Sequence, residues 1–209
     1  MNNSLNLGML EKFSNHVSDR FPFLKGAKLL LAVSGGIDSM VMAELFRKLD
    51  FDPSIAHCNF KLRDHESDND EAFVRDYCEL HRLKFHTIRF DTASFANDFR
   101  LSVQVAARQL RYRWFGELLA NDNYDYLLTA HHADDNIETF LLNLSRGTGL
   151  DGLTGIPRQN DKIIRPLLVF SRNEIEDFAA QNKIFWREDS SNSEDKYARN
   201  KIRHILSRI

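Results

Sequence analysis

The chain has 209 residues, enough for one α/β domain with a substantial core. Hydrophobic residues make up 43% and charged residues 28% of it, with a formal net charge of −2, which excludes disordered, collagen-like and disulfide-scaffold proteins. The longest apolar run, 29–33, is far below the ~20 residues that cross a bilayer, and the N-terminus lacks the features of a signal peptide. Because Cys58 and Cys78 are widely spaced, we expect reduced thiols in a cytoplasmic protein without membrane attachment.

The distribution of charge differs along the chain. The segment 196–209 carries five lysines or arginines and no acid, whereas 64–79 is strongly acidic and typical of a solvated helix face. A net charge of −2 argues against a nucleic-acid binder, but a local basic segment still provides a contact surface for phosphates.

Short apolar segments alternate with longer amphipathic ones. The pattern predicts strands at 28–33, 54–60, 84–90 and 124–130, and helices at 38–49, 67–82, 102–120, 134–145 and 171–182. Strands separated by helices of this length are typical of βαβ units and a parallel sheet. Four glycines and two prolines within 146–170 predict a long irregular segment after the fourth strand.

The residues after the first predicted strand are suited to binding phosphate. Gly35 and Gly36 allow a sharp turn and a close approach to a ligand, and the following helix directs its free N–H groups there. Ser34 and Ser39 add hydroxyl groups, and Asp38 would repel phosphates unless it caps N–H groups or shares a cation such as Mg²⁺. The alternative is a simple strand-to-helix turn capped by Asp and Ser.

This hexapeptide resembles the SGGxDS fingerprint of PP-loop ATP pyrophosphatases, in the order Ser34, Gly35, Gly36, Ile37, Asp38 and Ser39. The resemblance implies an α/β fold with a five-stranded parallel sheet sandwiched by helices, adenine nucleotide alpha hydrolase-like and Rossmann-like, with a small helical C-terminal extension. It also implies that these six residues bind ATP at the carboxyl ends of the strands, and that ATP is cut between its α- and β-phosphates.

A second candidate site follows the fourth predicted strand, in His131-His132-Ala133-Asp134-Asp135-Asn136-Ile137-Glu138-Thr139. On a helix, Glu138 lies one turn from both Asp134 and Asp135, so the carboxylates can converge on a metal or a nucleophile. Alternatively, they only complement the helix dipole. A zinc site is disfavoured because no cysteine or third histidine falls at ligand spacing.

Together with this segment, four others resemble the tRNA(Ile)-lysidine synthase family over roughly 28–206: residues 144–153, 164–168, 189–192 and 197–204. The resemblance implies that the wobble cytidine of tRNA(Ile), in a CAU anticodon, is adenylated at O2 by ATP with Mg²⁺. The amine of free L-lysine then attacks C2 and expels AMP, which gives lysidine. The familiar HxNHxLR stretch is His57-Cys58-Asn59-Phe60-Lys61-Leu62-Arg63 here, so a role for its second histidine is not carried over to Phe60.

We expect the catalytic residues to include Asp134, Asp135 and Glu138, whose individual roles stay open. Asp38 and Asp135 are candidates to share Mg²⁺. Arg111 matches the family's ARxxRY stretch, and it and Arg146 are expected to stabilise the leaving pyrophosphate unless they are surface arginines. On the same helix, an apolar stripe is expected to face the core, with Arg108 at its edge: Val103, Ala107, Leu110 and Trp114.

The family pattern suggests two parts, a PP-loop ATP-binding catalytic domain at 1–170 and, at 171–209, a helical extension that leads toward tRNA-binding domains. The sequence leaves open whether the chain is part of a longer protein or a short form, and sets no oligomeric state. Two other functions remain: a tRNA-thiolating or amide-forming PP-loop enzyme, and a non-catalytic nucleotide- or tRNA-binding module. Thiolation is disfavoured because Cys58 and Cys78 form no CxxC pair.

Overall fold

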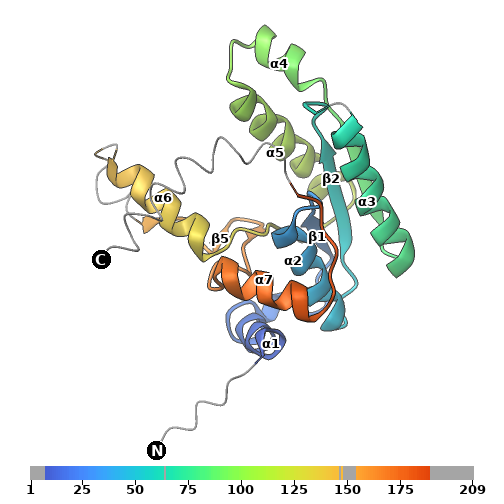
Figure 1. Ribbon diagram of the computed structural model, residues 1–209, viewed down its shortest axis with the longest axis vertical. Helices are drawn as coiled ribbons and strands as arrows, with labels where there is room; N and C mark the ends of the chain where they lie inside the picture. The colour runs from blue at the N-terminus through green and yellow to red at the C-terminus, as the bar shows by residue number, and fades with distance from the viewer. Residues whose placement is uncertain (1–7, 64, 146, 148–153, 189–209) are drawn as a thin grey trace, which may run out of the picture.

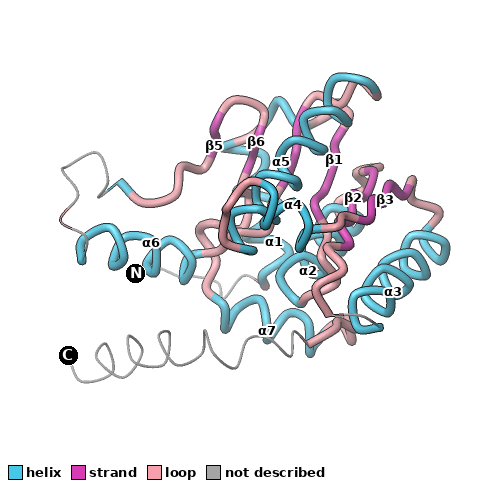
Figure 2. Tube along the Cα trace, turned by 90° about the horizontal axis from the view of Figure 1, so that it is seen from above, coloured by secondary structure: helices cyan, strands magenta, loops and turns pink. Residues whose placement is uncertain are grey.

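The computed structural model describes residues 8–63, 65–145, 147 and 154–188. Its centre is a sheet whose strands run in the order β3-β2-β1-β4-β6-β5 (Figures 1 and 2). The bounds of the strands are β1 (Leu29–Ala32), β2 (Ser54–Asn59), β3 (Phe85–Arg89), β4 (Tyr126–Leu128), β5 (Gln159–Asn160) and β6 (Ile163–Ile164).

The sheet is mostly parallel, which confirms the predicted α/β class. The strands β3, β2, β1, β4 and β6 are parallel neighbours, and β5 adds an antiparallel sixth strand at the edge. The β5–β6 hairpin lies within 146–170, which was predicted to be irregular throughout, so that prediction is wrong for these residues. Two-residue strands are too short to leave a periodic signal, and the reversal at Asp161 uses a positive φ of 51°.

Helices cover both faces of the sheet. Their bounds are α1 (Met9–Arg20), α2 (Ile37–Lys48), α3 (His65–His81), α4 (Thr92–Asp98), α5 (Val103–Asn121), α6 (Ala133–Ser145) and α7 (Arg172–Gln181), with a 3-10 turn, η1 (Pro22–Leu24). Five of them match the predicted helices within two residues. The other two α-helices, α1 and α4, were not predicted.

The hydrophobic core is divided by the sheet. Leu29 and Leu31 face a layer formed by α1, α2, α7 and part of α3, whereas Leu30 faces α5 on the other side. Successive strand residues point to opposite faces of the sheet, and these residues are buried on both faces because helices cover each one. On α5 the predicted apolar stripe is buried at Ala107, Leu110 and Trp114, but Val103, in the first turn, is exposed.

The helices α6 and α7 differ in how they pack. Every residue of α6 is at least partly exposed, and Figures 1 and 2 both show this helix extending away from the sheet. By contrast, α7 places Ile175, Phe178 and Ala179 in the same core cluster as α2. The domain boundary expected after residue 170 stays a prediction.

Across the described ranges, no helix combines the length and apolar character needed to span a bilayer.

The packing of α1 leads to a prediction about stability. Phe13 is fully buried, and its ring meets that of Phe46 on α2 edge to face, with centroids 5.4 Å apart. We expect Phe13→Ala to lower the free energy of unfolding by about 3–5 kcal/mol, because it leaves a cavity in the core. Phe185→Ala, at a side chain that is 79% exposed, is the control and should change it by less than about 0.5 kcal/mol. Urea unfolding measures both, and equal small effects would show that α1 is not part of the cooperative core.

Candidate functional site

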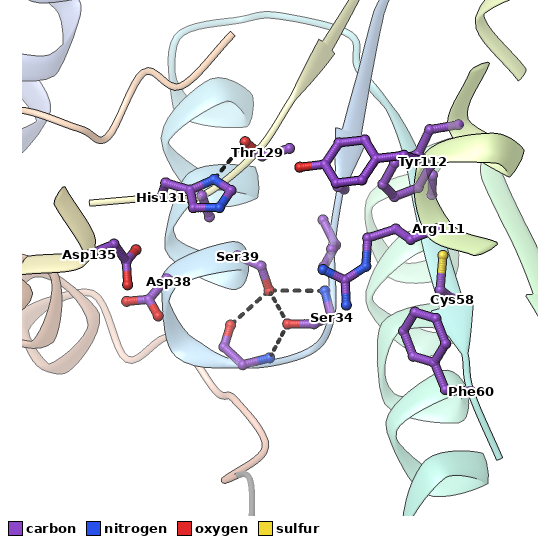
Figure 3. A pocket seen from close by; sticks show the side chains of 16 residues that line it. Ser34, Asp38, Ser39, Cys58, Phe60, Arg111, Tyr112, Thr129, His131 and Asp135 are labelled. Carbon is purple, nitrogen blue, oxygen red and sulfur yellow. Dashed lines mark hydrogen bonds between the residues drawn. The ribbon is translucent and has the colours of Figure 1, made fainter. Parts of the chain in front are cut away.

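The turn between β1 and α2 is held by its own serines. The Ser39 hydroxyl donates to the carbonyl of Gly36 (2.8 Å) and accepts from the backbone N–H of Ser34 (3.2 Å), and the two serine hydroxyls are 3.2 Å apart (Figure 3). Gly35 has a φ of +95°, which favours glycine, whereas Gly36 has an ordinary φ of −73° at the N-cap of α2. The turn is therefore shaped by Gly35 and the serines, and Gly36 leaves the approach to its backbone open.

A cavity of about 420 Å³ lies beside this turn, at the carboxyl ends of β1, β2 and β4. One part of its lining is polar and the other is apolar or aromatic (Figure 3). The polar part comprises Ser34, Gly36, Asp38, Ser39, Thr129, His131 and Asp135. The other part includes Ala32, Val33, Ala56, Cys58, Phe60, Tyr112 and Phe115, and the charged side chain of Arg111 lies among these residues. Such a lining suits a ligand with a planar ring at one end and an anionic group at the other.

Two carboxylates, those of Asp38 and Asp135, lie close together at one end of this cavity (Figure 3). The buried ring of His132 lies next to both, with Nε2 3.7 Å from Asp38 Oδ1 and 3.6 Å from Asp135 Oδ2. Burial raises the pKa of Asp38 and so does the nearby Asp135 carboxylate, while Arg172 and His132 oppose the rise. Asp135 Oδ2 also accepts the backbone N–H of His132 at 3.0 Å, which fixes the first turn of α6.

The carboxylates of Asp38 and Asp135 provide only part of the ligands that a Mg²⁺ ion needs. Within the described ranges, no group of three or more His, Cys, Asp or Glu side chains is arranged to hold a metal ion. Mg²⁺ is commonly bound by one or two carboxylates together with phosphate oxygens and water, so Asp38 and Asp135 fit an ion that arrives with a nucleotide.

A second cavity of about 290 Å³ adjoins the first. It is lined by Arg108, His131, Asp135, Glu138, Thr139, Ile156 and Arg165. His131 and Asp135 line both cavities. His131 Nδ1 is 2.9 Å from Thr129 Oγ1, and burial lowers the pKa of this histidine, so its ring is neutral at neutral pH.

The arginines of α5 are held by aromatic rings. The guanidinium of Arg111 lies 5.1 Å from the ring centroid of Phe60, which stacks on Phe90 at 5.7 Å, and that of Arg108 lies 4.9 Å from Tyr112. Phe60, where the sequence departs from the family pattern, is thus a wall of the first cavity and a support for Arg111.

The remaining predicted residues have different surroundings. Asp134 lines neither cavity, and its Oδ2 accepts the backbone N–H of Arg172 at 2.8 Å. Arg146 lies outside the described residues. Burial raises the pKa of Cys58 to about 12, so the thiol in the first cavity stays protonated and is a poor nucleophile. The catalytic roles proposed for Asp134, Asp135, Glu138, Arg111 and Arg146 stay predictions.

Several site residues were not proposed from the sequence, among them Arg165 and His131. Arg165 is only 6% exposed, lines the second cavity and donates from Nη1 to the carbonyl of Pro157 at 2.7 Å. His131 stood next to the predicted carboxylates but was weighed only as a zinc ligand. An arginine directly after the Ile163–Ile164 strand is the signal that marks Arg165, because residues at the carboxyl end of a parallel strand face the site.

Comparisons with known proteins show the family of the chain. Residues 7–208 match the PP-loop domain family. Among curated proteins, the tRNA(Ile)-lysidine synthase of Porphyromonas gingivalis is 44% identical over 204 residues, which is 97% of this chain and 45% of that protein. The protein of the same name from Bacillus subtilis is 37% identical over 190 residues, covering 88% of this chain and 40% of its own length. The chain thus spans less than half the length of these two relatives, and up to about two thirds of other proteins of the same name.

Solved structures share the fold at low sequence identity. The U34-tRNA thiolase NcsA of Methanococcus maripaludis superimposes with a TM-score of 0.68 at 18% identity, covering 86% of this chain and 66% of that one. The NH3-dependent NAD synthetase of Campylobacter jejuni gives a TM-score of 0.58 at 16% identity, covering 96% and 86%. At these identities the likeness concerns the fold alone.

Proposed function

Because this chain belongs to the PP-loop domain family, we propose that it is the ATP-binding catalytic part of a tRNA(Ile)-lysidine synthase. The substrates are ATP, tRNA(Ile) with a CAU anticodon and free L-lysine, and the products are lysidine in the tRNA, AMP and pyrophosphate. One observation carries the proposal beyond ATP binding: the two adjoining cavities share a wall formed by His131 and Asp135.

In the first step, the adenine of ATP lies against the aromatic part of the first cavity and its phosphates against the PP-loop, residues 34–39. The O2 atom of the cytidine attacks the α-phosphorus, and pyrophosphate leaves. The N-terminus of α2 and Arg111 stabilise the negative charge of the leaving group. Asp38 and Asp135 would hold the Mg²⁺ that supplies further charge neutralisation at the phosphates.

In the second step, lysine occupies the second cavity. Asp135 and Glu138 match its ammonium groups in charge, and Arg108 and Arg165 match its carboxylate. The attacking amine must lose a proton, and the neutral ring of His131 and the nearby carboxylates are the groups able to accept it. The amine then attacks C2 of the cytidine, and AMP leaves with the O2 oxygen.

Two other functions are less favoured. Thiolation would need a reactive cysteine, but burial raises the pKa values of Cys58 and Cys78 to about 12. A non-catalytic module has no requirement for a histidine and a carboxylate shared between two cavities.

The test is to measure pyrophosphate release by the 209-residue chain with ATP alone, with ATP and tRNA(Ile), and with ATP, tRNA(Ile) and lysine. With ATP and tRNA(Ile) but no lysine, we expect about one equivalent of pyrophosphate per enzyme. We expect repeated turnover only when lysine is added. The tRNA is supplied in excess, and a full-length curated relative serves as the positive control. A tRNA with uridine at the wobble position is the matched negative control. Turnover that needs ammonia or a sulfur donor instead of lysine would assign the chain to a different reaction.

A further inference from the structure

The residues from 171 to 188, here called the α7 arm, contact the PP-loop at two separate points. The arm begins with the capping box of α7, in which Ser171 and Glu174 bond each other's backbone N–H groups. Its helix packs against α2 through Ile175, Phe178 and Ala179. The arm is therefore anchored in the core that also supports the PP-loop.

The first contact is made by Arg172. Its Nη1 lies 2.7 Å from both carboxylate oxygens of Asp38, which is 134 residues away in the sequence. Its Nε donates to Glu176 at 2.7 Å, and its backbone N–H donates to Asp134 at 2.8 Å. One residue thus connects the PP-loop, the carboxylate helix α6 and α7.

The second contact is made by Arg187. Its backbone N–H donates to the carbonyl of Gly35 at 2.9 Å, next to the turn with positive φ. Its Nε donates to Asp70 on α3 at 2.9 Å, and Asp70 also accepts a hydrogen bond from Nη2 of Arg63 at 2.9 Å. The arm is consequently held to the peptide of Gly35 and to α3 as well as to Asp38.

We propose that Arg172 is a positioning residue for nucleotide binding, which acts by fixing and neutralising the carboxylate of Asp38, and that Arg187 supports the same loop. A carboxylate has about four lone-pair sites, and Arg172 approaches both oxygens from one side, so the remaining sites stay available to a cation in the cavity. Without Arg172, the negative charge of Asp38 would face the phosphates unbalanced. The inference rests on the proposed ATP site and does not depend on the tRNA reaction.

The test is a double-mutant cycle on the affinity for Mg·ATP, measured by calorimetry with the 209-residue chain. It compares Asp38→Asn, Arg172→Met and the double variant. We expect Arg172→Met to weaken binding at least about 10-fold, and the double variant to be no weaker than Asp38→Asn alone. Arg172→Lys should restore part of the loss. Glu176→Gln is the control, because it removes the other ion pair of Arg172 and leaves Asp38 in place; its affinity should equal that of the wild type.

Two results would overturn the proposal. If the loss of Mg·ATP affinity in the double variant equals the product of the losses in the two single variants, Arg172 acts independently of Asp38. The other result is unchanged or tighter Mg·ATP binding by Arg172→Met. Thermal unfolding of each variant identifies a folding defect, and if Arg172→Met does not fold, the same cycle with Arg172→Lys decides. A wild-type chain that binds no Mg·ATP would instead contradict the proposed function.

Discussion

Gly36→Val is expected to fold normally and to lose pyrophosphate release almost completely. The φ of −73° and ψ of 160° at Gly36 are accessible to valine, and the one described atom within 4 Å of an added Cβ would be the Ser34 hydroxyl oxygen, at an ordinary 3.5 Å. Valine is a poorer N-cap than glycine, so the free energy of unfolding should fall by about 1 kcal/mol. Gly36 lines the 420 Å³ cavity, so the new methyl groups would obstruct the backbone at which we propose that the phosphates bind. We expect turnover to fall by at least about 100-fold, as when a donor to a developing negative charge is lost.

The neighbouring glycine provides the contrast. Gly35→Ala places a side chain at a φ of +95°, which costs on the order of 1–3 kcal/mol, so this variant should lose stability as well as activity. Gly116→Ala, where an added Cβ has no described atom within 4 Å, is the control for a glycine outside the site and should retain both. Chemical denaturation and pyrophosphate release are measured on all three variants. Wild-type turnover in a folded Gly36→Val protein would show that the phosphates bind elsewhere.

The parts of the fold that the sequence predicted are those with a strong local signal. The strand β1 is a continuous apolar run with residues buried on both faces, and the loop after it combines two glycines with two serines. The carboxylates of α6 were recognised because one helical turn separates them. These features depend on residues that are close in sequence, so pattern and spacing were sufficient.

The parts that were missed depend on contacts between distant residues. The helix α1 carries only a few apolar residues, and its place in the core follows from Phe13 meeting Phe46. Arg172 contacts Asp38 only because α7 returns to pack beside α2, which neither segment signals by itself. Similarly, His131 and Asp135 line the second cavity together with Arg108 and Arg165, which come from distant parts of the sequence.

The last prediction concerns the carboxylates of α6. Asp135→Asn and Glu138→Gln keep the size and much of the hydrogen bonding of the side chains but remove their charge. If they hold Mg²⁺ or lysine, or accept a proton, turnover should fall by about 10²–10⁴-fold in each variant. If they only complement the helix dipole, each should cost at most about 1 kcal/mol of stability and leave turnover unchanged. Pyrophosphate release is measured at saturating ATP and tRNA over a range of lysine concentrations that includes subsaturating ones, beside urea unfolding.

Asp134→Asn is the matched comparison, because it makes the same chemical change on the same helical turn outside both cavities. Its carboxylate accepts the backbone N–H of Arg172, and the amide oxygen of asparagine can accept the same bond without the charge, so the variant should lose at most about 1 kcal/mol of stability. Its turnover should fall less than that of Asp135→Asn and Glu138→Gln.

Asp135 lines both cavities whereas Glu138 lines only the second, so these two variants should also differ from each other. Asp135→Asn should weaken Mg·ATP binding and lysine use together, and Glu138→Gln should raise the KM for lysine while Mg·ATP affinity stays unchanged. Near-normal turnover in Asp135→Asn and Glu138→Gln would place the chemistry away from this shared wall. Equal losses in these two and in Asp134→Asn would indicate that the charge of the helix terminus matters more than the position of any one carboxylate.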